Sequence, residues 1–208
     1  EFGISDTQLG LLTGILFAAF YATLGIPFAA WADRGNRRNI IAIAVTIWSG
    51  MTARSGFAGN FWHRALAHMG VGIGEAGGTP PATAMIADIF PPKRRALALG
   101  IYTTGISLGI LIGFILGGFI AERYGWRVGF FVAGAPGLLI AAILFLTVKE
   151  PERGASEDRT TDEDAPSLRE TLSFFKSQRA MVSLLLGGVF VCISANAFLA
   201  GIPLYLIR

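Results

Sequence analysis

Long apolar stretches alternate with short polar segments along the chain. Four stretches contain no charged residue, namely 8–32, 96–121, 128–148 and 180–207. A helix needs about 20 apolar residues to cross the hydrocarbon core of a bilayer, and each of these stretches is long enough. Two further stretches, 39–56 and 61–87, are interrupted by only a few charged residues. The pattern therefore predicts an all-α integral membrane protein with six spanning helices.

The composition agrees with a membrane protein and argues against other classes. Of the 208 residues, 53% are hydrophobic and 15% are charged, whereas a soluble domain has about 25% charged residues. The net charge of +3 does not indicate nucleic acid, because the basic residues lie between the apolar stretches. Cys192 is the one cysteine, and His63 and His68 have no further ligands at metal-site spacing. We expect no cofactor, no metal and no enzyme activity.

The positions of Lys and Arg predict the orientation of the helices. Segments 33–39, 88–95 and 149–179 hold most of the 17 basic residues, and the positive-inside rule places them in the cytoplasm. The first predicted helix then runs inward, so we expect at least one more helix upstream and interpret the chain as part of a longer protein. The expected location is a bacterial inner membrane, and the expected state is a monomer.

The polar segment 149–180 divides the chain. We expect an N-terminal membrane bundle at 1–148, a cytoplasmic central linker at 149–180 and the first helix of a second bundle at 181–208. The first half of the linker is charged and poor in apolar residues, which is typical of a flexible connection. Its second half has the helix-capping pattern Ser167–Glu170 before apolar residues, which predicts a short interfacial helix.

The string GIPFAAWADRGNRR at 25–38 carries the strongest motif. Asp33 follows an apolar helix, and because a helix C-terminus disfavours an acid, we expect a partner for it. The string resembles the loop between helices 2 and 3 of the major facilitator superfamily, roughly G-x-x-x-D-R-x-G-R-R. The residues that match are Asp33, Arg34, Arg37 and Arg38. The resemblance implies a helical bundle with twelve helices, of which this chain would carry helices 2 to 7.

Other strings are similar to the Spinster-like branch of that family. Residues 60–102 look like its helix 4 and the loop that follows, and residues 122–127 look like the end of helix 5. The similarity implies a secondary transporter for lipid-like amphiphiles. It also implies a cytoplasmic ion-pair cluster that closes the inner side in the outward-open state. Its members would be Asp33 and the nearby arginines Arg34, Arg37 and Arg38, with Asp88 pairing to Arg34 or Arg37.

Three glycines in the predicted helix 96–121 lie four residues apart, at Gly109, Gly113 and Gly117. Residues four apart share one helix face, and glycines there allow another helix to approach closely. The spacing resembles the antiporter signature of the family, G-x-x-x-G-P-x-x-G-G, but Phe114 takes the proline position. We therefore favour a packing seam over an antiport motif.

Glu75 is an acid near the midpoint of the predicted helix 61–87. An acid at that depth costs about 3 kcal/mol on insertion scales, so it should face a cavity or a partner. Neighbouring glycines, with Pro80 and Pro81, loosen the same helix, and transporters place their sites at such irregular helices. We expect Glu75 to take up and release a proton or to couple to substrate.

His68 and Arg64 lie on the same side of that helix, two and three turns outward. The Spinster-like branch usually has an arginine at the position of His68, and a histidine is not a permanent counter-charge. Arg64 either substitutes in part for that arginine or extends to the outer surface. Packing or anchoring at the interface is the alternative for His68, and structural pairing the alternative for Glu75.

The sequence thus predicts a secondary active transporter for an amphiphilic, lipid-like or organic anionic solute, coupled to protons through Glu75. One alternative is an uncoupled facilitator for small organic anions or drugs. Another is a membrane receptor or scaffold that does not transport. The expected partners are a small or lipid-like substrate, protons and the lipid bilayer, without nucleic acid.

Overall fold

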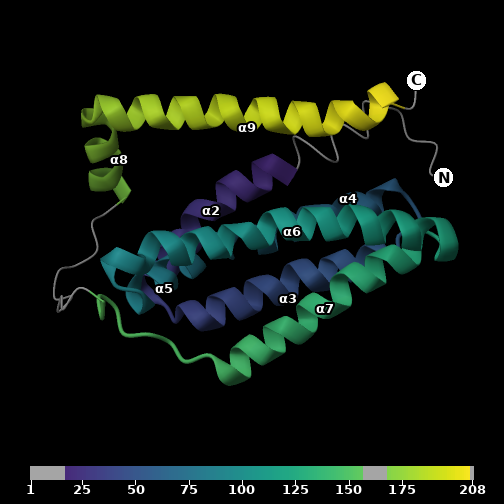
Figure 1. Cartoon of the computed structure of the whole chain (residues 1–208), viewed down its shortest axis with the longest axis horizontal. Coiled ribbons are helices and arrows are strands. Elements are labelled where there is room, and N and C mark those ends of the chain that lie inside the picture. Colours follow the sequence, from purple (N-terminus) through teal and green to yellow (C-terminus); the bar gives the residue numbers. More distant parts are fainter. Residues whose placement is uncertain (1–16, 157–167, 207–208) are drawn as a thin grey trace. The chain divides into compact units, whose positions relative to one another are not determined.

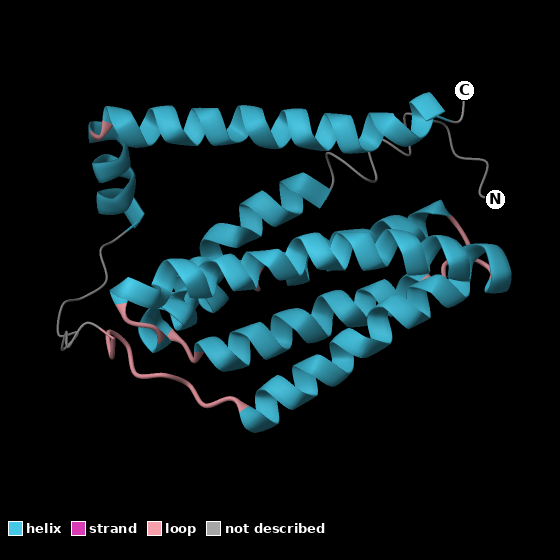
Figure 2. Ribbon diagram, viewed as in Figure 1, coloured by secondary structure: helices cyan, strands magenta, loops and turns pink. Residues whose placement is uncertain are grey.

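The computed structural model describes residues 17–156 and 168–206, which fall in two compact units, Glu1–Thr161 and Asp162–Arg208. Helices account for nearly all of these residues, and the described ranges contain no strand (Figures 1 and 2). The first unit contains α2 (Phe17–Arg34), α3 (Arg37–Ser55), α4 (Phe61–Ala76), α5 (Thr79–Ile89), α6 (Pro92–Tyr124) and α7 (Trp126–Thr147). The second contains α8 (Leu168–Ser177) and α9 (Arg179–Leu206). The all-α prediction is confirmed.

Length and composition mark some of these helices as membrane-spanning. Within the described residues, α6 and α7 are long and apolar enough to cross a bilayer, and Arg179–Ser194 of α9 forms a shorter apolar stretch. Helices α2 and α3 have 18 and 19 residues, but the charged residues at their ends lower their mean hydropathy. The remaining helices of the first unit, α4 and α5, are too short to span alone.

Helix α3 occupies the centre of the first unit. It packs most extensively against α7 on one side and α4 on the other, and the backbones of α4 and α7 lie near each other at few points. Its buried positions are mostly small residues; those buried along its length are Arg37, Ile40, Ala42, Ala44, Val45, Ser49 and Ser55. Small side chains let neighbouring helices approach closely in a bilayer, where lipid is as apolar as leucine.

Glycines on both neighbours complete this close packing. A methyl group at Gly74 of α4 would lie 2.6 Å from the backbone nitrogen of Trp48, which is too close for any real side chain. A methyl group at Gly134 of α7 would lie 2.6 Å from the backbone oxygen of Ser49. The backbones of α4 and α7 therefore lie directly on the backbone of α3.

The single helix expected at 61–87 is wrong, because the structure contains two helices there. Helix α4 ends at Ala76, and α5 begins at Thr79. Between them, the amides of Gly77 and Gly78 donate to the carbonyls of Gly74 and Glu75, each at 3.1 Å, in a tighter turn than an α-helix has. Proline has no amide hydrogen, so Pro80 and Pro81 cannot donate to the carbonyl groups of Ala76 and Gly77.

The glycine seam expected on α6 has no partner in the described part of the chain. A methyl group at Gly109, Gly113 or Gly117 would meet no atom within 4 Å. No residue of α6 is buried among the described helices. A role for these glycines in helix packing therefore stays a prediction.

The expected division of the chain also stays a prediction, although the helix ends lie near its boundaries. Helix α7 ends at Thr147, and α9 begins at Arg179, close to the expected limits of the linker. Helix α8 lies where a short helix was expected. The capping residue proposed for it, Ser167, lies outside the described residues.

The close contact at Gly74 generates a stability prediction. We expect Gly74→Ala to lower the free energy of unfolding by about 1–3 kcal/mol, the usual cost of overpacking. Gly50→Ala in α3 is the matched control, since a methyl group there meets nothing within 4 Å. Alanine is about 1 kcal/mol better than glycine inside a helix, so the control should be neutral or stabilising. Denaturant titration in detergent micelles measures both variants, and equal stabilities would contradict the packing described here.

Candidate functional site

The first group of candidate residues, Glu75, His68 and Arg64, lies along α4. Intervals of seven and four residues place the three on one helix face. Gly72 of α4 lies against Phe17 of α2, and Gly74 lies against Trp48 of α3. Successive residues are about 100° apart around a helix, so Glu75 falls between the side that meets α2 and the side that meets α3. Glu75 itself is half-buried there.

The carboxyl group of Glu75 has no hydrogen bond or ion pair with any described residue. The residue is half-buried, and its neighbours Gly74 and Ala76 are buried. Its backbone oxygen accepts the amide of Gly78 at the start of the helix break. An acid therefore lies in the last turn of α4, where the regular backbone ends.

His68 and Arg64 contact aromatic rings rather than Glu75. The ring of His68 lies 5.1 Å from the ring of Phe17, between centroids. The guanidinium of Arg64 lies 3.8 Å from the centroid of the Phe130 ring in α7, a cation–π contact. Its Nη1 atom is buried without a hydrogen-bond partner among the described residues. Neither His68 nor Arg64 forms a hydrogen bond or ion pair with Glu75 in the described part of the chain. The three residues share a helix face but do not contact one another through such bonds.

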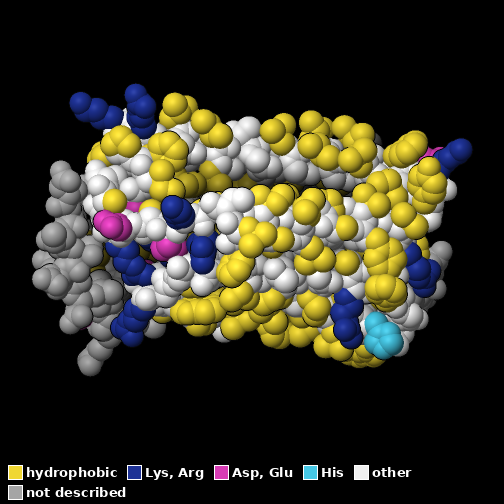
Figure 3. Space-filling view, turned by 90° about the horizontal axis from the view of Figure 1, so that it is seen from below, with side chains coloured by type: hydrophobic (Ala, Val, Ile, Leu, Met, Phe, Trp, Pro, Cys, Tyr) yellow, Lys and Arg dark blue, Asp and Glu magenta, His cyan; other side chains and the backbone are white. Residues whose placement is uncertain are grey.

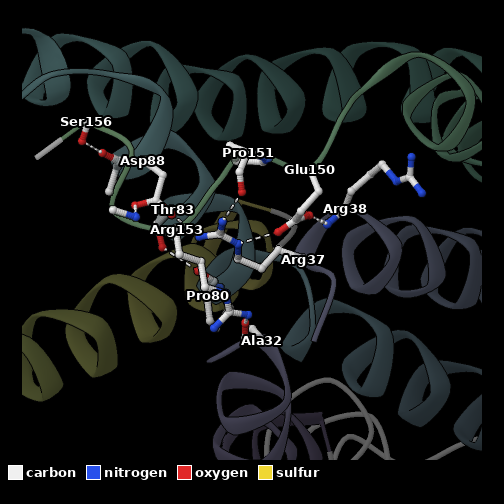
Figure 4. Close-up of polar contacts among 12 residues, drawn as sticks. Ala32, Arg37, Arg38, Pro80, Thr83, Asp88, Glu150, Pro151, Arg153 and Ser156 are labelled. Atoms are coloured by element: carbon white, nitrogen blue, oxygen red, sulfur yellow. Dashed lines mark hydrogen bonds and ion pairs between the residues drawn. The ribbon is translucent and has the colours of Figure 1, made fainter. Parts of the chain in front are cut away.

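The second group surrounds Arg37 at the start of α3 (Figure 4). Arg37 is a buried cation, with 4% of its surface exposed. Its Nη1 atom donates to Oδ2 of Asp88 at 2.5 Å, and its Nε atom donates to Oε1 of Glu150 at 2.8 Å. Its Nη2 atom donates to the carbonyl of Pro151 at 3.0 Å. One guanidinium thus joins α3, the end of α5 and the segment after α7.

Both carboxylates have a second hydrogen-bond donor. Oε2 of Glu150 accepts the backbone amide of Arg38 at 2.7 Å, in the first turn of α3 where helix amides lack internal partners. Oδ1 of Asp88 accepts the backbone amide of Gly154 at 3.1 Å. Each acid therefore contacts both the buried arginine and a backbone amide.

Residues 153 and 156 attach the same segment to the end of α2 and make a further contact with α5. One terminal nitrogen of Arg153 donates to the carbonyls of Ala32 and Gly35, at 3.0 and 2.8 Å, at the end of α2. The hydroxyl of Ser156 donates to the carbonyl of Ala87 in α5 at 2.7 Å. We call this cluster the clasp; its members are Arg37, Asp88, Glu150, Pro151, Arg153, Gly154 and Ser156.

The clasp realises part of the expected ion-pair cluster. Of the two arginines proposed as partners of Asp88, Arg37 is the one that binds it. Asp33 and Arg34 are exposed and have no ion pair within the described residues, so the expected partner of Asp33 is not found there. Arg38 donates from Nη1 to the carbonyl of Val148 at 3.3 Å, and its guanidinium lies 5.1 Å from the Phe145 ring centroid.

Sequence reasoning missed Glu150 and Arg153, because the charged segment after α7 was expected to be flexible. That expectation is wrong for residues 150–156, which are held by the hydrogen bonds just described. Their position in the sequence could have indicated a role. Glu150 and Arg153 follow directly after a long apolar helix, on the side of the membrane where the arginines at 34–38 are also expected. Composition alone did not show that they would find partners.

Charge and hydrophobicity are separated on the molecular surface. Figure 3 shows hydrophobic side chains along the helices and the Lys and Arg side chains gathered towards helix ends. Many large apolar side chains are exposed, including Ile101, Ile115 and Leu146. Such surfaces are stable in contact with lipid chains, which agrees with the spanning helices described above.

The clasp determines the ionisation of Glu150. Partial burial alone would disfavour its charged form, but the hydrogen bonds from the Arg37 side chain and the Arg38 backbone outweigh burial. The pKa of Glu150 is therefore lowered. The carboxylate is charged at neutral pH and above, so the clasp is intact in that range.

Comparison with known proteins identifies the family. A family model of the Major Facilitator Superfamily matches residues 1–208. The chain therefore belongs to this superfamily, a class of multi-pass membrane transporters rather than enzymes, and within it the chain is Spinster-like.

Individual relatives agree with this assignment. An MFS-type efflux pump of Mycolicibacterium smegmatis is 38% identical over 145 residues, covering 70% of this chain and 34% of the pump. The probable sphingolipid transporter spinster homolog 1 of Arabidopsis thaliana is 31% identical over 153 residues, covering 74% of this chain and 31% of that protein. This chain thus spans about a third of the length of the curated relatives it matches.

A solved structure supports the same fold. It is the crystal structure of a bacterial homolog to the human lysosomal transporter Spinster, in an inward-facing and unoccupied conformation. It is 43% identical, with a TM-score of 0.72, over 91% of this chain and 45% of that one. The Spinster-like expectation from the sequence is confirmed.

The buried cation of the clasp generates the next prediction. We expect Arg37→Ala to lower the free energy of unfolding by about 2–3 kcal/mol, somewhat less than the ~3–5 kcal/mol of a fully buried pair, because Asp88 and Glu150 retain some solvent contact. Arg34→Ala is the control, since Arg34 is exposed; it should change stability by less than about 0.5 kcal/mol. Denaturant titration in detergent is the measurement, and similar losses in both variants would argue against the clasp.

The lowered pKa of Glu150 predicts how the clasp depends on pH. An acid with a lowered pKa stabilises the fold above its ordinary pKa of about 4.3, and this contribution is lost as the pH falls through the lowered value. The stability difference between the unmodified protein and Glu150→Gln should therefore be full near neutral pH and shrink in acid. The check is to titrate both proteins with denaturant at a series of pH values. A difference that grows on acidification would be inconsistent with the clasp.

Proposed function

We propose that this chain is part of a secondary transporter that moves an amphiphilic, lipid-like or organic anionic solute by alternating access. Transport is coupled to protons through Glu75. The proposal rests on one observation above the others: Glu75 is a half-buried acid at a helix break, and it has no partner in the described part of the chain.

A carboxyl group in this position is suited to proton coupling. Its desolvation is not offset by a bound cation among the described residues, so neutralisation by a proton relieves an energetic cost. The regular helix ends one residue later, at Ala76, and transporters place their coupling sites near broken helices. Proton uptake at Glu75 therefore changes the charge of a site whose backbone is already irregular.

The clasp supports the mechanical part of the proposal. It joins the C-terminal ends of α2 and α5 and the N-terminal end of α3 to the segment that follows α7. With these ends joined, the helices of the first unit move as one body when the transporter changes its open side. The gate role expected from the family for Arg37 and Asp88 is part of this proposal.

The substrate class follows from charge and from the names of relatives. Arg64 and His68 provide positive or ionisable groups on the face that carries Glu75, which favours an anionic head group. The similar Arabidopsis protein is a probable sphingolipid transporter, a name that fits an amphiphile with a charged head and an apolar tail.

A second candidate function is the efflux of small organic anions or drugs. The observation that favours it is the similarity to the MFS-type efflux pump of M. smegmatis. Both candidate functions use the same fold and the same role for Glu75 in this chain. They differ in the size of the apolar part of the transported substrate.

The decisive experiment is flux into proteoliposomes driven by a pH gradient, with sphingosine phosphate and a lysophospholipid as substrates. We expect gradient-dependent flux that falls in Glu75→Gln to the level of protein-free vesicles, because the amide cannot exchange a proton. Glu122→Gln is the matched control, since Glu122 is an exposed acid near the end of α6, and it should transport normally.

The other outcomes separate the alternatives. Flux that needs the gradient but survives in Glu75→Gln would make Glu75 a structural residue. Flux that ignores the gradient would indicate a facilitator. If neither lipid is transported but a fluorescent drug is, the efflux candidate replaces the first one.

A further inference from the structure

Helix α8 is amphipathic by its register. Leu168, Leu172 and Phe175 fall within about 60° of one another around the helix axis, since successive residues are about 100° apart. Ser173 and Ser177 fall on the opposite side. The helix therefore has one apolar and one polar side although it has only 10 residues.

The described apolar side chains of α8 are not enclosed within the second unit. Phe174 is 57% exposed, and Phe175 is partly exposed. Ser173 and Lys176 are exposed as well, so the polar side of α8 also faces outward. Phe174 lies about 100° from Phe175 and outside the apolar side, whereas Phe175 lies on that side and is partly exposed. An apolar medium can therefore cover the apolar side of α8 at Phe175.

The sequence neighbours of α8 determine where this surface lies. Only Gln178 separates α8 from α9, and the 28 residues of α9 contain no charge after Arg179. If α9 crosses the bilayer, Arg179 lies at its boundary, and α8 lies within a few residues of the head groups. Figure 1 shows that α8 turns away from the axis of α9 instead of continuing it.

Charge complementarity identifies the partner. Residues 168–179 contain three basic residues, Arg169, Lys176 and Arg179, and one acid, Glu170. Basic residues beside a spanning helix attract anionic lipid, each contributing favourably within a Debye length of the surface. Amphipathic helices with apolar residues on one side and basic residues on the other lie in the membrane interface.

We propose that α8 is a membrane-surface helix that binds anionic phospholipid head groups. Phe175, on the apolar side, inserts at the boundary of the acyl chains, while Lys176 and Arg179 contact phosphate groups. The helix thereby anchors the connection between the two units at the bilayer. This proposal concerns lipid binding alone and does not depend on the transported solute or on Glu75.

The test places a spin label at Phe175→Cys, on the apolar side of α8, or, as the matched control, at Ser177→Cys, on the polar side, both in a Cys192→Ser background. The purified protein is reconstituted in vesicles of phosphatidylcholine, with and without phosphatidylglycerol. We expect the label at 175 to be more accessible to oxygen than to a water-soluble nickel complex, and the label at 177 to show the reverse. Phosphatidylglycerol should increase this contrast, and the double change Lys176→Gln with Arg179→Gln should abolish the increase.

Three results would overturn the proposal. Free access of the nickel complex to both labels would show that α8 lies in water. Exclusion of both oxygen and nickel from position 175 would show that protein covers the apolar side of α8. Insertion that is the same with and without phosphatidylglycerol would remove the anionic head groups from the proposal. Size-exclusion chromatography of each variant in detergent confirms that the labelled proteins are folded.

Discussion

The close approach of α3 to its two neighbours is the contact on which the first unit depends. The helix provides small residues along its length, and α4 and α7 meet it with glycines at positions 74 and 134. In lipid, apolar side chains gain little by leaving the solvent, so helices associate through dense packing and hydrogen bonds. Both contacts bring backbone against backbone, which fixes the register of all three helices with few large side chains.

The helices themselves were largely predictable from the sequence, because long uncharged stretches have few other stable forms in a membrane. The break between Ala76 and Thr79 was not, although Pro80 and Pro81 had marked the helix as loosened. Apolar residues continue on both sides of the break, so hydrophobicity gives no boundary there. The seam on α6 shows a related limit: glycines four apart occur on α4 and on α6, and only tertiary structure shows which of them meet a described partner.

The candidate site was predictable where a charged residue occurred at an unusual position, inside an apolar stretch or at the end of one. Glu75 stood out as an isolated acid in an apolar stretch, and Asp88 and Arg37 as opposite charges at the ends of successive helices. Glu150 and Arg153 could not be assigned, because their partners come from residues more than 110 positions away. Asp33 shows the converse, since its place at a helix end suggested a partner that the described residues do not provide.

Helix α3 also connects the clasp with the part of α4 that carries Glu75. Arg37 lies in its first turn and is fixed by the clasp, while Trp48 lies further along and contacts the backbone of α4 beside Glu75. A rigid helix rises about 1.5 Å per residue, so these two positions are about 16 Å apart along one rod. The helix therefore connects the clasp rigidly to the backbone beside the half-buried Glu75.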